Sequence, residues 1–232
     1  ADFGRNRKPL LAGHTPAAFQ SVFDEVTRAG DSAVVITLAS QFSGTYQSAC
    51  IAAEDYENIY VVDSRTAAIG SGILAEYALR CAEQGMEAGA LAALLEKKRE
   101  DVRLFALLDT LEYLKRGGRI SKTVAFAGGL LNIKPLITVE DGEVLVVGKA
   151  RGAKQGMALL TEKLLSDGGI NFDLPILLGY SGTDASNLEK YRADSREIWQ
   201  GRGDTLPSTL LCSVIGTHTG PGVVAAACFK ND

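Results

Sequence analysis

Arg119 is the first residue whose setting points to chemistry. It follows a short amphipathic segment with Leu111 and Leu114 on its apolar side, and the paired glycines Gly117 and Gly118 stand directly before it. Glycine adopts the positive φ angles that end a helix, so both glycines are expected to stop this segment. A fixed cation beside flexible backbone favours a ligand site. The alternative is a helix stop followed by a solvated basic patch.

A second group lies in the loop from Ala39 to Thr45, which ends in Ser43, Gly44 and Thr45. The loop follows a predicted buried strand and precedes a predicted helix, which places it where ligands of open α/β folds collect. Its hydroxyls and the free amides at the start of the helix would bind an anion. The alternative is that Ser43 only caps the helix. A nucleophilic serine is less favoured, because Ser43 lacks the G-x-S-x-G pattern.

The chain has only two histidines, His14 and His218. His218 stands in the glycine-rich run 216–222, a predicted turn-rich loop after a strand, and its glycine neighbours favour the edge of a binding site. The alternative is a structural histidine. His14 precedes the first predicted helix cap, and we interpret it as a surface or loop residue.

Composition narrows the classes of function. The net charge is -4 and the pI is about 5.3, which argues against nucleic acid or an anionic membrane surface as the main partner. No cluster of His, Cys, Asp and Glu has metal-ligand spacing. Neither G-x-x-x-x-G-K-S/T nor G-x-G-x-x-G occurs, so a nucleotide enzyme is poorly supported.

The expected cellular location follows from the lengths of the apolar runs and from the spacing of the cysteines. No run reaches the ~20 apolar residues needed to span a bilayer, and the N-terminus has no signal pattern. Four cysteines without CxxC spacing stand in apolar runs, which predicts reduced core thiols; they are Cys50, Cys81, Cys212 and Cys228. We therefore expect a soluble, cytoplasmic protein. A polar lead-in without an initiator Met or a first strand predicts a truncated N-terminus.

The first part of the chain alternates strands and helices. The predicted helices run from Thr15-Pro16 to near Gly30, from about Tyr46 to Asp55, and from Ala67 to Gln84. The predicted strands are Ser32 to Leu38 and Ile59 to Val62. This order is typical of a parallel sheet with crossover helices, here a small parallel α/β/α layer.

The second part predicts a six-stranded mixed sheet with helices on it. The strands are 102–108, 133–139, 144–149, 175–180, 209–214 and 223–229, and the helices are 87–100, 121–131, 153–165 and 185–200. Asp141-Gly142 between two apolar runs predicts a hairpin. We place the domain boundary near Gly85, which divides the chain into residues 1–85 and 86–232.

Five blocks of sequence together resemble the DegV family of bacterial fatty-acid-binding proteins. In chain order they are Ser43–Ala49, Val62–Ser64, Asp109–Ser121, Leu131–Pro135 and His218–Gly222, and they cover nearly the whole chain. The resemblance implies two α/β domains that clasp a long-chain fatty acid such as palmitate. Its carboxylate would be held by serine and threonine hydroxyls near an arginine and a histidine.

The resemblance also assigns residues and a partner. Ser43, with Gly44 and Thr45, matches the hydroxyl-bearing loop, Arg119 the motif arginine, and His218 the histidine before Gly-Pro-Gly. Members of this kind serve as the acyl-carrying subunit of a fatty acid kinase and present the carboxylate to a separate ATP-binding subunit. No catalysis by the chain alone and no cofactor are then expected.

The segment before the first helix departs from the family pattern. Leu10–Pro16 stands where the family has Thr-Ser-Gln-Pro, and the second carboxylate-binding hydroxyl would fall on or next to Leu11, which cannot donate a hydrogen bond. Thr15 is the candidate replacement, although it is also the helix cap. The missing strand leaves two strands in the first sheet, which is marginal for independent stability.

The acyl tunnel has candidate lining residues, although plain core packing is the favoured explanation for each of them individually. The candidates are Phe42, Ile69, Ile73, Phe126, Leu130 and Ile137. Two other functions stay open. One is an enzyme in which Ser43 or His218 acts directly on a small phosphorylated or acyl substrate. The other is a regulatory module without a kinase partner.

Overall fold

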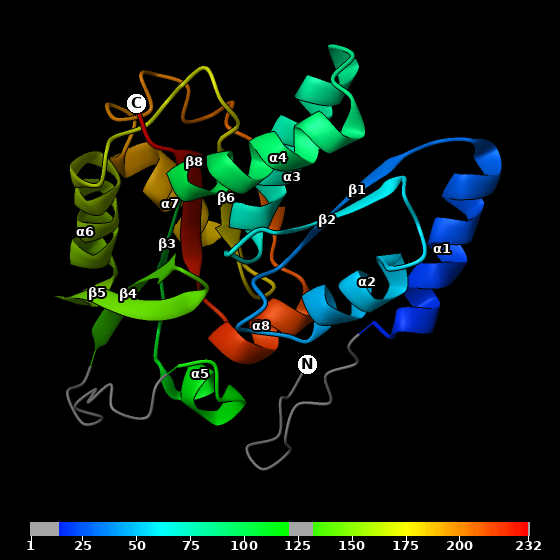
Figure 1. Ribbon diagram of the computed structural model, residues 1–232. Coiled ribbons are helices and arrows are strands. Elements are labelled where there is room, and N and C mark those ends of the chain that lie inside the picture. Colours follow the sequence, from blue (N-terminus) through cyan, green and yellow to red (C-terminus); the bar gives the residue numbers. More distant parts are fainter. Residues whose placement is uncertain (1–13, 121–131, 232) are drawn as a thin grey trace.

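The computed structural model describes residues 14–120 and 132–231. These residues form two β-sheets with helices packed around them, as Figure 1 shows. The predicted helix 121–131 lies outside the described residues, as do Leu11, Phe126 and Leu130.

The helices and strands follow the order expected of an α/β chain. The helices are α1 (Pro16–Ala29), α2 (Thr45–Ala53), α3 (Ile69–Glu83), α4 (Ala88–Lys98), the 3₁₀ turn η1 (Arg99–Asp101), α5 (Glu112–Gly117), α6 (Gly152–Ser166), α7 (Ser186–Asp194) and α8 (Ser213–Thr219). The strands are β1 (Ala33–Thr37), β2 (Ile59–Asp63), β3 (Val102–Leu107), β4 (Ile133–Glu140), β5 (Glu143–Arg151), β6 (Leu177–Tyr180), β7 (Ser208–Leu210) and β8 (Val224–Phe229).

The first sheet consists of β1 and β2, which pair in parallel as the sequence predicts. Helices α1 and α2 cover one face, where Phe23 packs with Ala52 and Ile59. Helix α4 packs against both strands. A two-stranded sheet alone is only marginally stable in water. The packing of these helices on the strands therefore stabilises the pair.

The second sheet has six strands in the order β5-β4-β3-β8-β6-β7 and is mixed, as predicted. Only β6 and β7 pair in parallel, and the other neighbours are antiparallel. The Asp141-Gly142 turn joins β4 to β5, with φ of 49° and 77° at its two residues. Positive φ at both positions is what a two-residue hairpin requires, so the predicted hairpin is confirmed.

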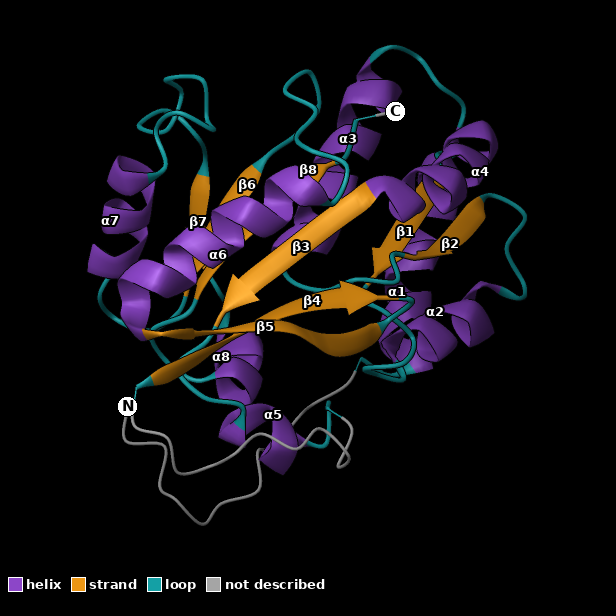
Figure 2. Ribbon diagram, turned by 90° about the vertical axis from the view of Figure 1, so that its left-hand side faces the viewer, coloured by secondary structure: helices purple, strands orange, loops and turns teal. Residues whose placement is uncertain are grey.

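Side chains alternate between the two faces of this sheet. Phe105 and Leu107 of β3 face α6 and pack with the buried core around Trp199. Leu104 and Ala106 face the opposite side, where α3 packs against β3, β6 and β8 (Figure 2). This second core continues into the first sheet, so the two sheets share one hydrophobic cluster. The division of the chain at Gly85 stays a prediction.

Two predicted elements are wrong in their extent. The helix predicted over 185–200 ends at Asp194. Just after it, the Ser195 hydroxyl donates to the carbonyl of Tyr191 and accepts a hydrogen bond from Trp199 Nε1 at 3.0 Å. Trp199 is fully buried. The strand predicted over 209–214 is only Ser208–Leu210.

The loop predicted around His218 is also wrong, because the chain from Ser213 to Thr219 is helix α8. The β-branched pair Val214 and Ile215 is typical of a strand, which explains the error. The helical bond from Gly216 N–H to the Cys212 carbonyl, 2.9 Å long, starts α8 instead.

Not every cysteine is a core thiol. Cys81 and Cys228 are buried and Cys50 is partly buried, but Cys212 is exposed, which contradicts the prediction for that residue. All four are free. Across residues 14–120 and 132–231, no helix combines the length and apolarity needed to span a membrane.

Candidate functional site

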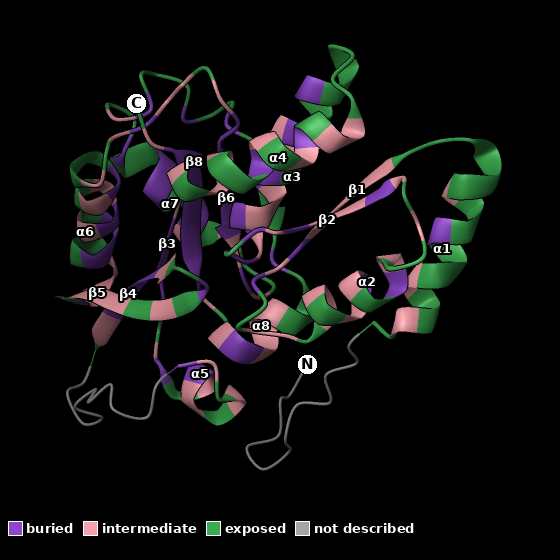
Figure 3. Cartoon of the chain, in the orientation of Figure 1, coloured by how far each residue is buried: buried purple, intermediate pink, exposed green. Residues whose placement is uncertain are grey.

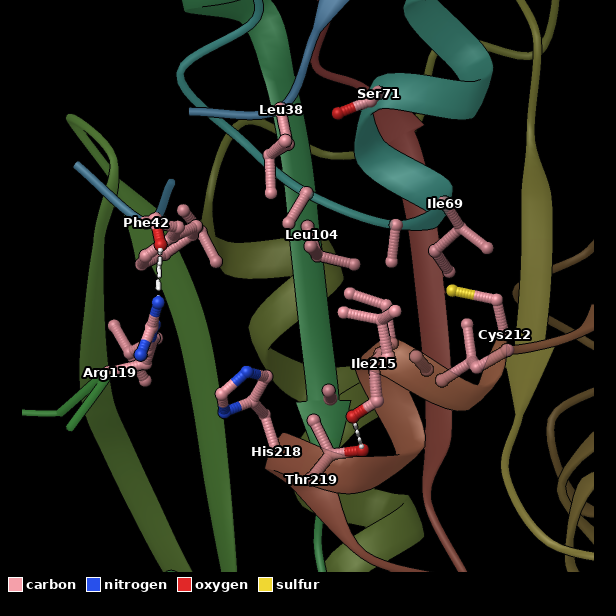
Figure 4. Close-up of a pocket in the computed structure, with 18 of the residues that line it drawn as sticks. Leu38, Phe42, Ile69, Ser71, Leu104, Arg119, Cys212, Ile215, His218 and Thr219 are labelled. Atoms are coloured by element: carbon pink, nitrogen blue, oxygen red, sulfur yellow. Dashed lines mark hydrogen bonds between the residues drawn. The ribbon is translucent and has the colours of Figure 1, made fainter. Parts of the chain in front are cut away.

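A cavity of about 420 Å³ opens between the first-sheet loops and the six-stranded sheet. Four of the predicted site residues line it: Ser43, Thr45, Arg119 and His218. Figure 4 shows His218 on α8 and Arg119 to its side, below Phe42, while Leu38 and Ser71 lie at the opposite end. The structure therefore brings together groups separated by more than half the chain.

The walls of the cavity are apolar. Its floor is the face of β3, β4 and β8 that carries buried side chains, namely Leu104, Ala106, Ile137, Val223 and Ala225. Figure 3 shows β8 as buried along its length. Among the predicted tunnel residues, Phe42, Ile69 and Ile137 line the cavity, whereas Ile73 belongs to the packed core and does not.

The cavity is lined by basic side chains and by no acidic side chain of the described residues. Arg119, His14 and His218 are its basic side chains, and within the described residues no aspartate or glutamate lines it. The chain as a whole carries a net charge of -4. A local excess of basic groups in an acidic protein favours an anionic ligand group at this place.

The hydroxyls of Ser43 and Thr45 stand at the start of α2. Their oxygen atoms are 2.9 Å apart, and the Thr45 N–H donates to Ser43 Oγ at 3.3 Å. Gly44, which precedes the helix, is exposed and does not line the cavity. Ser43 thus accepts a backbone N–H at the start of α2 and also lines the cavity, but the interpretation of Ser43 as the helix cap is wrong, because Gly44 occupies the cap position and no side chain caps the helix.

Arg119 is held by the end of α5. Gly118 has a φ of 67°, and the amides of Gly118 and Arg119 donate to the carbonyls of Lys115 and Leu114, both at 3.1 Å. This is the Schellman pattern that glycine favours at a helix end. Gly117 has no positive φ, so the expectation that both glycines take this conformation is wrong for Gly117.

The guanidinium of Arg119 crosses from the second sheet to the first-sheet loop. Its Nε and Nη2 donate to the carbonyl oxygen of Phe42 at 3.2 and 3.1 Å, and its Nη1 donates to the carbonyl of Gly117 at 2.6 Å. Figure 4 shows this link to Phe42. Arg119 therefore fixes the loop that carries Ser43, in addition to bringing positive charge to the cavity.

Gly117 is required for a steric reason. A Cβ at this position would lie 2.1 Å from His218 Nδ1, so only glycine lets α5 approach the imidazole. Gly220, just after α8, makes a similar contact, because a Cβ there would lie 2.5 Å from the ring of Tyr113. Glycine at these two positions thus allows α5 and α8 to pack closely.

His218 is 8% exposed, and its Nδ1 has no hydrogen-bond partner among the described residues. Burial lowers the pKa of His218 below its ordinary value, and the positive charge of Arg119 lowers it further. The imidazole is therefore neutral at pH 7. A bound anion would counter both effects and favour the protonated form.

Two residues near the start of α1 behave differently from each other. Thr15 caps α1 by accepting a hydrogen bond from the Ala18 amide at 3.3 Å, and it does not line the cavity. Its role as a replacement hydroxyl stays a prediction. His14 does line the cavity, which sequence reasoning missed. The available signal was its place in the segment that replaces the family's Thr-Ser-Gln-Pro.

A second cavity of about 210 Å³ lies near the tip of the β4–β5 hairpin. Two arginines of its lining form ion pairs: Arg65 Nη1 lies 2.8 Å from Glu100 Oε1, and Arg103 Nε lies 3.0 Å from Asp167 Oδ2. Ion pairing leaves little net charge here. Among the described residues, no group of three or more His, Cys, Asp or Glu side chains could hold a metal ion.

Comparison with known proteins identifies relatives of the whole chain. Residues 7–231 match the family model described as "Uncharacterised protein, DegV family". A DegV domain-containing protein of Caldanaerobacter subterraneus subsp. tengcongensis is 37% identical over 221 residues, covering 93% of this chain and 76% of its own length. One from Lactococcus lactis subsp. lactis is 34% identical over 216 residues, covering 89% and 73%.

Solved structures show the same fold. A DegV family protein from Thermus thermophilus, described by its fatty acid binding, superposes with a TM-score of 0.81 at 30% identity, over 95% of this chain and 78% of that one. A stearic acid-binding protein from Eubacterium ventriosum gives 0.78 at 25% identity, over 94% and 77%. The two sheets, the order of the motifs and these matches lead to one conclusion: this chain belongs to the DegV family.

Proposed function

We propose that this protein binds a long-chain fatty acid in the 420 Å³ cavity, with the acyl tail along the apolar floor and the carboxylate beside Ser43, Arg119 and His218. The observation that carries the proposal is the cavity's composition. Apolar walls end in basic and hydroxyl groups, and no acidic side chain of the described residues lines the cavity. A fatty acid has the same division between an apolar tail and an anionic head.

The two ends of the ligand contribute differently to the free energy of binding. A buried CH₂ contributes about 0.8 kcal/mol, so a long acyl tail supplies roughly 10 kcal/mol before ordering costs are subtracted. A hydrogen bond to a charged head adds about 1.5–3 kcal/mol. The tail therefore provides most of the affinity, and the head fixes the position of the carboxylate.

The donors at the polar end suit a carboxylate. The hydroxyls of Ser43 and Thr45 can both donate, and the two together have more donors than their mutual hydrogen bond uses. Arg119 has five N–H donors, and its bonds to Phe42 and Gly117 leave one on each terminal nitrogen. The fatty acid binding of the Thermus relative and the stearic acid binding of the Eubacterium relative support the same ligand class.

We further propose that the protein presents the bound carboxylate to a separate ATP-dependent fatty acid kinase subunit and catalyses nothing alone. Support comes from the family resemblance and from the site's position, since the exposed Gly44 adjoins Ser43 and Thr45. No other cofactor is invoked in this proposal, because the ATP chemistry would belong to the partner. The proposal places the protein in the cytoplasm, where such a partner has ATP.

Native mass spectrometry after gentle purification tests the binding proposal directly. A co-purifying fatty acid, or stoichiometric uptake of added palmitate, is expected. A protein that carries no lipid and also ignores palmitate would contradict it. The kinase role is tested by adding a candidate ATP-dependent subunit and measuring acyl phosphate, which should form only when loaded protein, partner and ATP are all present.

The enzymatic alternative makes a different prediction. In the described structure the Ser43 hydroxyl pairs with Thr45, and no hydrogen bond joins it to His218. Incubation of the protein alone with acyl phosphates or acyl esters should give no turnover. Turnover that is abolished in the Ser43→Ala variant would support the enzyme and displace the carrier.

A further inference from the structure

Both histidines of this chain line the same cavity. His218 reaches it from α8, beside the six-stranded sheet, and His14 reaches it from the residue before the cap of α1, beside the two-stranded sheet. The two imidazoles are 204 positions apart in sequence but border one space. This sequence has no other histidine, so every imidazole of the chain lines this one cavity.

His14 is held in place by its neighbours in the chain. Thr15 has an extended backbone (φ -82°, ψ 157°) and caps α1 through the Ala18 amide, which fixes the direction in which the chain enters the helix. The imidazole packs edge-on against Phe19, with ring centroids 5.9 Å apart, and Phe19 packs in turn against Phe23 at 5.8 Å. The ring is exposed but anchored on an aromatic row.

The first-sheet side of the cavity has no other basic side chain among the described residues. Its other polar side chains are the hydroxyls of Ser43, Thr45 and Ser71, whereas Arg119 and His218 both belong to the other side. We propose that His14 is a further carboxylate-binding residue, which donates an imidazole N–H to the ligand head from the first-sheet side. This inference rests on the proposed function, and it gives the head a basic partner on each side.

The arrangement also accounts for the segment in which the family's hydroxyl is lost. Leu11 cannot donate a hydrogen bond, and Thr15 uses its oxygen to cap α1 away from the cavity. His14 is the described residue of that segment that lines the cavity. An imidazole N–H therefore takes over the donor role in this chain.

Affinity measurements on paired ligands test the proposal. Palmitate and hexadecanol share a tail, but only palmitate has a charged head. In His14→Ala the dissociation constant for palmitate should rise about fivefold, the equivalent of about 1 kcal/mol for an exposed charged contact, and that for hexadecanol should not change. His14→Gln, which keeps an N–H donor, should recover part of the loss. Gln20→Ala, an exposed change on α1, is the matched control.

Nuclear magnetic resonance gives a second readout that a merely structural role would not move. The chain's two histidines give two sets of imidazole C–H signals, and His14→Gln assigns them. Palmitate should shift the His14 signals and hexadecanol should not. Unchanged palmitate affinity in His14→Ala together with unmoved His14 signals would overturn the inference while the fatty acid function stands. A wild-type protein that binds no palmitate would instead overturn the proposed function.

Discussion

His218 is a neutral base placed where an anion is expected. Its pKa is lowered first by burial and then by Arg119, so the unliganded protein takes up this proton only below the ordinary value of about 6.5. A bound carboxylate raises that pKa, because it favours the charged imidazole. Between the two pKa values the complex holds a proton that the free protein lacks.

This linkage predicts how affinity depends on pH. Palmitate affinity should rise as pH falls from 8 through the pKa of His218 in the complex, and should level off below the pKa in the free protein. Isothermal titration in two buffers of different ionisation enthalpy should show proton uptake on binding. His218→Gln should reduce this uptake, with His14→Gln measured alongside to separate the two imidazoles. Equal uptake in His218→Gln and wild type would contradict the assignment.

Arg119 has two effects that substitution can separate. It holds the Phe42 carbonyl with two N–H groups, and it brings charge to the cavity. Arg119→Ala should weaken palmitate binding by about tenfold to a hundredfold, the range for a lost charge-assisted hydrogen bond. Arg119→Lys keeps the charge but cannot donate two hydrogen bonds in a fork. Its palmitate affinity should therefore lie between those of the wild type and Arg119→Ala.

Hexadecanol distinguishes these effects for Arg119. If the clamp on Phe42 matters, Arg119→Ala should weaken hexadecanol binding as well, because the loop that closes the cavity is loosened. A variant that loses palmitate affinity and keeps hexadecanol affinity would show that charge alone matters. Phe42 itself carries no sequence signal for this contact, since the acceptor is a backbone carbonyl 77 residues away.

At the scale of elements, glycines allow the close approach of α5 and α8. Gly117→Ala puts a methyl group 2.1 Å from His218 Nδ1 and should destabilise the fold by roughly 1–3 kcal/mol, the usual cost of overpacking. Gly216→Ala is the matched control in α8, because nothing lies within 4 Å of its Cβ position. That change should be neutral or stabilise by up to about 1 kcal/mol.

Urea unfolding of the two variants measures this contrast. Gly117→Ala should lower the midpoint and Gly216→Ala should not. Equal midpoints would mean that α5 moves away from α8 without a change in the free energy of unfolding. The close packing at Gly117 would then have no role in stability. Palmitate affinity should also fall in Gly117→Ala, since the same methyl group displaces the imidazole.

The same elements show what the sequence can and cannot predict. The hairpin at Asp141-Gly142 is predictable because its residues alone determine the turn. Helix α8 is not, because Val214 and Ile215 have strand propensity and tertiary packing decides against it. The paired glycines of α5 look alike in sequence, yet Gly118 is needed for its φ and Gly117 for its contact with His218.

At the scale of the whole molecule, the cavity is a gap in a core that both sheets share. Buried side chains of the strands form its floor. The loop that carries Ser43 forms the other wall, and Arg119 binds this loop through the carbonyl of Phe42. The class of fold and the polar end were predictable from motifs and their order. The width of the gap was not, because it depends on how α3, α8 and the sheet pack together.

Because both sides contribute to the cavity wall, the ligand should stabilise the molecule as a unit. At a free concentration of about 100 times the dissociation constant, palmitate adds about 2.7 kcal/mol to the free energy of unfolding. For a chain of this length that corresponds to a rise in Tm of roughly 5–10 °C, measurable by calorimetry. Hydrogen exchange should slow in the Ser43 loop and in α5 and α8 alike. Protection confined to one side would mean that the ligand binds a single wall, and the head group would then lack the contacts across the cavity on which its position depends.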